Sequence, residues 1–177
     1  MACFKRVTAM DGEIVNRVAK SQLITLDLEE WYPKGPRFGL DISQWLEEGL
    51  ILREKNFREA LAVHDWQQYK DGYAALYCSS DAVIPAWAYM LIGSYLNPVA
   101  RQVVVGSPEM METLLFRERL ENLDLTPYHD RPVIIKGCSK LPVPPSAYVW
   151  ALQRIQNVAK SVMYGEACSS VPIYRKK

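Results

Sequence analysis

The sequence has no apolar run long enough to span a membrane. The longest, residues 82–96, contains Pro85 and Gly93 and is shorter than the eighteen or more residues that a membrane helix requires. The N-terminus also lacks the apolar core and cleavage site of a signal peptide. We therefore expect a cytoplasmic protein with no membrane partner, in which the four cysteines stay reduced and do not form a disulfide framework.

The chain also lacks a charge of one sign and a phosphate-binding glycine motif. Its 177 residues carry a formal net charge of +1, and 49% of them are hydrophobic. This composition argues against disorder and against a nucleic-acid partner. The scattered glycines match no dinucleotide or phosphate fingerprint, so no nucleotide cofactor is expected. A protein partner or a small-molecule substrate is compatible with these features.

Short apolar strands and amphipathic helices alternate along the chain. Because four- to five-residue apolar strands that alternate with helices are typical of parallel sheets, we predict an α/β fold. It would be a single three-layer domain over residues 10–177, with a mainly parallel sheet covered by helices and a last strand that is parallel or antiparallel. Residues 1–9 read as an N-terminal extension, because Met10 resembles a second start. The predicted strands are 23–26, 73–77, 102–105, 133–136 and 171–174.

The predicted helices have recognisable starting residues. Asp41 can cap a short helix, and Ser107 followed by Pro108 is a typical start for a longer one. The other predicted helices cover residues 53–66, 85–96 and 146–163.

Three of the four cysteines are followed directly by serine. These are Cys78, Cys138 and Cys168. A small polar residue after a cysteine suits a turn that directs N–H and hydroxyl groups toward the sulfur and stabilises a thiolate. Cys78 and Cys138 each follow a predicted strand, and in an α/β sheet sites gather beyond the carboxyl ends of the strands.

One hypothesis is a metal site, most simply zinc, with iron as an alternative metal. Cys78, Cys138 and Cys168 would supply three thiolates and His64 the fourth ligand, which is a tetrahedral zinc set. The sequence contains no Cys-x-x-Cys pair, which is the usual sequence signal of a zinc site. Cys168 is also a difficulty, because the preceding helix should carry the chain to the opposite sheet edge. The site requires an antiparallel last strand, or a chain that runs back to the carboxyl edge after Met163.

Two other hypotheses stay open. A thiol-dependent enzyme or redox sensor would use Cys78 or Cys138, with His64 or His129 as the base. Alternatively, the cysteines are buried and inert in a non-enzymatic module that binds a protein partner through exposed aromatic surface. His64 lies on or beside the apolar stripe of its predicted helix, so it fits a satisfied core histidine at least as well as a ligand.

Several stretches of the sequence resemble an uncharacterised bacterial family, the domain of unknown function numbered twenty-four eighty. The resemblance runs from about Met10 to the C-terminus and implies no established activity. It favours a shared thiolate site, because His64, Cys138 and Cys168 lie within the similar stretches. These stretches are residues 12–18, 49–55, 64–66, 136–140 and 164–169.

The metal hypothesis predicts that protein purified without added metal retains zinc or iron. Thiolate sites hold metal tightly, so elemental analysis should find close to one equivalent per chain. Less than about a tenth of an equivalent would contradict the hypothesis.

Overall fold

The computed structural model describes residues 22–137 and 140–177 and is an α/β fold with two sheets. The four-stranded sheet has the order β1-β5-β6-β7, and the three-stranded sheet has the order β2-β3-β4. All neighbouring strands are parallel except β6 and β7. The strands are β1 (Ile24–Asp27), β2 (Arg37–Asp41), β3 (Tyr73–Tyr77), β4 (Gln102–Val105), β5 (Pro132–Lys136), β6 (Ser161–Glu166) and β7 (Ser169–Arg175). The predicted α/β class and mainly parallel pairing are confirmed, and the last strand is antiparallel.

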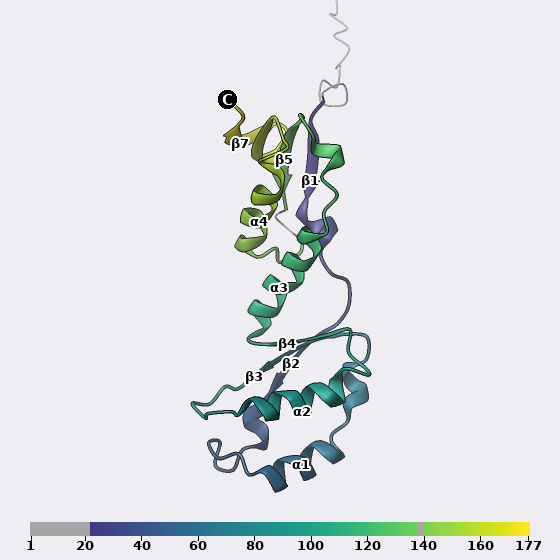
Figure 1. The fold of residues 1–177 in the computed structure, drawn as a ribbon, viewed down its shortest axis with the longest axis vertical. Helices are drawn as coiled ribbons and strands as arrows, with labels where there is room; N and C mark the ends of the chain where they lie inside the picture. The colour runs from purple at the N-terminus through teal and green to yellow at the C-terminus, as the bar shows by residue number, and fades with distance from the viewer. Residues whose placement is uncertain (1–21, 138–139) are drawn as a thin grey trace, which may run out of the picture.

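The prediction of one sheet is wrong, because the strands form two separate sheets. Strand β1 pairs with β5, and the whole three-stranded sheet lies between them in the chain. Figure 1 shows the two sheets at different levels along the long axis of the molecule. The alternation of strands and helices along the chain predicts where strands lie and that most of them are parallel. It does not predict which strands pair with each other.

In the part of the chain that the structure describes, four α-helices cover the sheets, and short 3-10 helices connect several elements. Helices α1 and α2 pack on one face of the three-stranded sheet, and α3 packs on its other face. Both faces of β3 are therefore covered, which explains its almost entirely apolar sequence. None of the helices in the described parts of the chain is long and apolar enough to cross a membrane. The helices are α1 (Glu54–Val63), α2 (Ala86–Leu96), α3 (Pro108–Glu121), α4 (Pro145–Ile155), η1 (Leu28–Trp31), η2 (Ile42–Trp45), η3 (Trp66–Tyr69) and η4 (Thr126–Tyr128).

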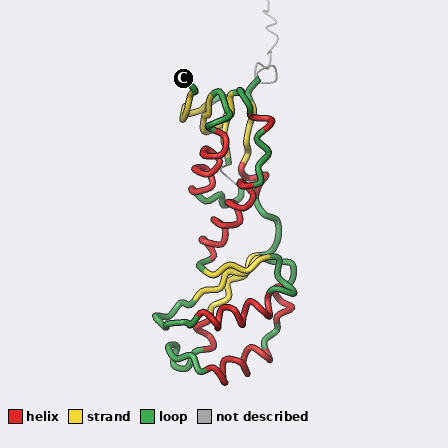
Figure 2. The backbone as a smooth tube through the Cα atoms, in the orientation of Figure 1, coloured by secondary structure: helices red, strands yellow, loops and turns green. Residues whose placement is uncertain are grey.

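Helix α3 is shared by the two sheets. It begins as predicted, with the Ser107 hydroxyl accepting a hydrogen bond from the Met110 N–H at 3.2 Å. Met111 and Leu115 pack against the three-stranded sheet. Phe116 and Leu120 belong instead to the core of the four-stranded sheet. Figure 2 shows α3 as the helix between the two groups of strands.

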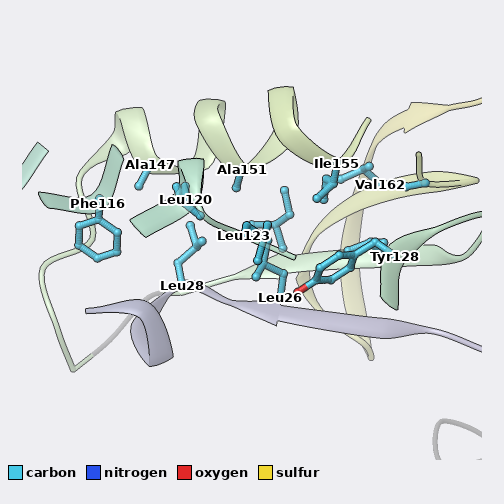
Figure 3. Packing of buried hydrophobic residues seen from close by; sticks show 13 residues of the cluster. Leu26, Leu28, Phe116, Leu120, Leu123, Tyr128, Ala147, Ala151, Ile155 and Val162 are labelled. Atoms are coloured by element: carbon cyan, nitrogen blue, oxygen red, sulfur yellow. The ribbon is translucent and has the colours of Figure 1, made fainter. Parts of the chain in front are cut away.

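The core of the four-stranded sheet lies between that sheet and helices α3 and α4. Ala147, Ala151 and Ile155 recur every four residues along α4 and are fully buried. Figure 3 shows them pointing toward Leu120 and toward the strand that carries Leu26. The small alanines let α4 pack closely against its neighbours.

The predicted helix 146–163 is too long, because its last part is strand β6. Helix α4 ends at Ile155, and Val162 and Tyr164 then follow the two-residue period of a strand. Pairing with β5 satisfies the backbone of this segment, so the sheet determines its structure. Strand β2 was not predicted, and the helix after Asp41 is the 3-10 helix η2 rather than an α-helix.

Shortening Phe116 should destabilise the whole fold, because this side chain is fully buried on the shared helix. We expect Phe116→Ala to lower the free energy of unfolding by about 3–5 kcal/mol, as for other buried phenylalanines. Met110→Ala on the same helix is the control, since Met110 is 49% exposed. Urea unfolding measures both variants, and a loss below about 1 kcal/mol for Phe116→Ala would contradict the packing role of α3.

Candidate functional site

His64 lies at the C-terminal end of α1, inside an aromatic cluster. Its Nε2 atom is 2.9 Å from the Tyr69 hydroxyl and 3.3 Å from the Gln68 side-chain nitrogen. The imidazole ring also contacts Trp45 and Trp66, with ring centroids 5.3 and 4.6 Å apart. Burial lowers the pKa of His64 from its usual 6.5, although Asp65 acts in the opposite direction. These contacts are those of a satisfied, partly buried histidine.

Cys78 follows β3 and packs against the core beneath α1 and α2. Its sulfur lies 3.2 Å from the Ser80 hydroxyl. Tyr89 lies in the first turn of α2. Burial raises its pKa, and the nearby Cys78 raises it further. Cys78 therefore sits at the carboxyl end of its strand, as predicted, with a hydroxyl near its sulfur.

Asp41, the last residue of β2, is hydrogen-bonded to the loop that follows β3. Its Oδ1 atom accepts hydrogen bonds from the backbone N–H groups of Ser43 and Ser79, each at 3.0 Å. Burial alone would raise the pKa of Asp41, but the hydrogen bonds from Ser79 and Ser43 outweigh it and lower the pKa below its usual value. The carboxylate is thus a fixed part of the loop that carries the predicted thiol.

Cys168 lies in the turn between β6 and β7 and is exposed. Because β6 is parallel to β5, this turn is at the carboxyl edge of the four-stranded sheet, beside the end of β5. The Lys136 ammonium lies at the same edge, 3.1 Å from Asp27 and 3.7 Å from Glu166. Cys168 thus reaches a carboxyl edge, as the metal hypothesis required.

The predicted ligands are distributed over two sheets. Cys78 follows a strand of the three-stranded sheet, whereas Cys168 belongs to the four-stranded sheet, so the expected single edge is not formed. Cys138 lies outside the described residues, and Cys3 does too. Within residues 22–137 and 140–177, no three His, Cys, Asp or Glu side chains are grouped as metal ligands would be. The four-ligand zinc site stays a prediction.

An exposed apolar groove lies between α4 and the β6–β7 hairpin. It has a volume of about 340 Å³ and is lined only by apolar and aromatic residues. Val149 in α4 is 54% exposed, and Tyr164 and Ile173 in the hairpin are 42% and 49% exposed. The lining residues are Ile135, Pro145, Tyr148, Val149, Leu152, Met163, Tyr164 and Ile173, which we call the α4–β7 groove.

The topology explains why this groove is open. Parallel neighbours need crossover connections, and these bring α3 and α4 onto the sheet. Strands β6 and β7 are antiparallel and joined by a tight turn, so no helix comes with them. Helix α4 has α3 on one side, and on its other side the groove lies over the hairpin.

A polar pocket of about 420 Å³ lies at the amino ends of β3 and β4, beside α3. Several of its polar groups already have partners. Arg101 donates to the Lys34 carbonyl at 2.8 Å, and the Gln102 side chain donates to Glu118 at 3.1 Å. The α4–β7 groove is therefore the stronger candidate site, because it exposes apolar surface to water at a free-energy cost.

Sequence reasoning missed this groove, although the sequence contains an indication of it. Helix α4 has two apolar stripes; one is fully buried in its own core, and the other is only partly buried against that core, through Tyr148 and Leu152. Pro145, Tyr148, Val149 and Leu152 form the second stripe at helical spacing.

A protein-family model matches residues 12–176, almost the whole chain. The chain belongs to the family described as protein of unknown function, DUF2480. The match confirms the family resemblance of the sequence and assigns no activity. No curated protein and no solved structure matches the chain.

The environment of His64 predicts a pH-dependent stability. Because burial lowers its pKa in the folded protein, the unfolded chain binds the proton more readily below pH 6.5. The contribution of neutral His64 to the free energy of unfolding is complete above pH 6.5. It is lost as the pH falls from 6.5 through the lowered pKa of the folded protein. We expect His64→Gln to reduce the loss of unfolding free energy between about pH 7.5 and about pH 5.5.

Urea unfolding at the two pH values measures this effect. His129→Gln is the control, because His129 is exposed and belongs to the loop before β5. An unchanged pH dependence in His64→Gln would contradict the described environment.

Proposed function

We propose that this protein is a non-enzymatic interaction module whose α4–β7 groove binds an amphipathic helix. The observation that carries the proposal is the uncharged, exposed groove where the helical layer of the sheet ends. Contiguous exposed apolar surface on a folded protein marks a binding site more often than a solvated face.

The shape of the site favours a helix as the ligand. The groove has one wall formed by a helix and a floor formed by residues of β5, β6 and β7, and α4 itself lies in a similar place beside α3 on the sheet. Two helices on a sheet pack with their axes about 8–10 Å apart, so a bound helix would continue the layer beyond α4. Its apolar side chains would cover Tyr164 and Ile173.

An added β-strand is a poorer ligand than a helix. Strand β7 is an edge strand, so its outer side could in principle pair with an extended peptide. However, Pro172 lies in the middle of β7, and proline has no backbone N–H to donate. A strand paired there would lose ladder hydrogen bonds, and edge prolines are a common protection against such pairing.

The cysteine–zinc site is a second, less supported proposal. Its support is the position of Cys78 and Cys168 at carboxyl edges of strands, where sites of α/β proteins gather. Against it, the two strands belong to different sheets, and the Nε2 atom of His64 is already hydrogen-bonded to Tyr69. Against a thiol-dependent role for Cys78, its sulfur is hydrogen-bonded to Ser80, whereas His64 is hydrogen-bonded to Tyr69 and His129 lies beside Asp130.

A peptide titration tests the groove directly. The probe is an amphipathic peptide of leucine and lysine, about four helical turns long. It is added to methyl-labelled protein at a concentration where light scattering shows a monomer. We expect methyl signals of Val149, Leu152 and Ile173 to shift, because these side chains line the groove. Signals of Val63 and Val83, which are exposed elsewhere, should not shift.

Matched variants show whether the effect is local. Ile173→Thr keeps a β-branched residue in the strand but removes apolar surface, so the peptide should bind about fivefold to tenfold more weakly. Val83→Thr makes the same kind of change at a residue that is 92% exposed and outside the groove. Shifts confined to other surfaces, or equal binding by the two variants, would contradict the proposal.

A further inference from the structure

We infer that the helix bound in the α4–β7 groove is α4 of a second copy of this chain, which makes the protein a symmetric dimer. This inference rests on the proposed function, because it identifies the ligand of the same groove. Each copy would supply its helix to the partner and receive the partner's helix in return.

Helix α4 carries the residues that a groove-binding helix needs. One stripe, Ala147, Ala151 and Ile155, is fully buried in its own core. The other stripe, Pro145, Tyr148, Val149 and Leu152, has the spacing i, i+3, i+4 and i+7 that helices use as anchors in apolar grooves. A helix with two apolar stripes is normally packed on two sides, and α4 lacks a helix on the second side within the described chain.

The same stripe is also one wall of the groove. The stripe that would bind and the groove that would receive it are therefore parts of the same surface. A twofold axis beside α4 would place this surface of one copy against the same surface of the other copy. In such an arrangement residue i contacts residue j of the partner and the reverse contact follows by symmetry. A heterologous partner would have to supply a matching stripe that this chain already contains.

The charges of the surface permit this self-association. None of the eight groove residues is charged, so the lining itself brings no like charges together when two copies meet. Three charged side chains, Arg117, Glu121 and Arg154, lie on the other side of α4, where they line a pocket between α3 and α4. The dimer surface is thus apolar at its centre, as the cores of homodimer interfaces are.

The Tyr148 hydroxyl, at one side of the groove, already has a partner within its own chain. The Tyr148 hydroxyl donates a hydrogen bond to the Gly137 carbonyl. Its ring packs edge-on against Tyr164, with centroids 5.6 Å apart. Covering Tyr148 with a second helix therefore does not leave its hydroxyl without a hydrogen-bond partner, and the cost of burying this group unpaired is avoided.

Sedimentation of the full chain tests the inference. We expect a species of twice the 20.2 kDa chain mass at high concentration, in equilibrium with monomer on dilution. Val149→Glu should weaken the dimer by about 100-fold or more, because each copy would bury an uncompensated carboxylate. Ile173→Glu should do the same from the opposite wall of the groove. Circular dichroism confirms folding, which both exposed positions should tolerate.

The controls place a carboxylate on other exposed apolar residues. Val83→Glu and Met90→Glu lie outside the groove, at residues that are 92% and 75% exposed, and should remain dimeric. A dimer that survives both groove substitutions would overturn the inference, because its interface would lie elsewhere. So would dissociation by all four variants alike.

A monomer at every concentration also overturns the inference, and the peptide titration then separates two cases. If the leucine–lysine peptide still shifts the groove methyls, the groove binds the helix of a different protein and the proposed function stands. If the peptide does not bind, the proposed function fails together with the dimer.

Discussion

The packing of α3 against both sheets is the interaction on which the rest of the structure depends. Leu115 and Phe116 are adjacent in the chain but enter different cores, one under the three-stranded sheet and one under the four-stranded sheet. A helix that is apolar on two sides has little amphipathic contrast, and it is stable here because both sides are buried. Removing either contact would expose the apolar face of a sheet, so the two sheets share one source of stability.

The connection between the last two strands then determines where the surface stays open. Each parallel pair of the four-stranded sheet carries a crossover helix, whereas β6 and β7 are joined by a turn. The hairpin completes the sheet with a short turn, and within residues 22–137 and 140–177 no helix lies beside the second stripe of α4. The feature that carries the proposed function is therefore an exposed apolar groove beside α4.

Local features of the sequence predict most elements, but they do not predict the pairing of strands. The strands at 73–77 and 102–105 and the Ser107 cap are as predicted, because apolar runs and capping residues act locally. The division into two sheets depends on β1 pairing with a strand more than one hundred residues away, which no local pattern encodes. For the same reason the Cys-Ser pairs suggested one shared site, although Cys78 and Cys168 belong to different sheets.

In the dimer that we infer, the α4–β7 groove is covered by the same surface of a second copy. The most direct measurement is a filtered nuclear Overhauser experiment on a mixture of methyl-labelled and unlabelled chains, which detects only contacts between copies. The account predicts signals from the methyl groups of Val149 and Ile173 to the Tyr148 and Tyr164 rings of the other copy. Contacts between copies at any other surface, or none in a sample that sedimentation shows to be dimeric, would contradict it.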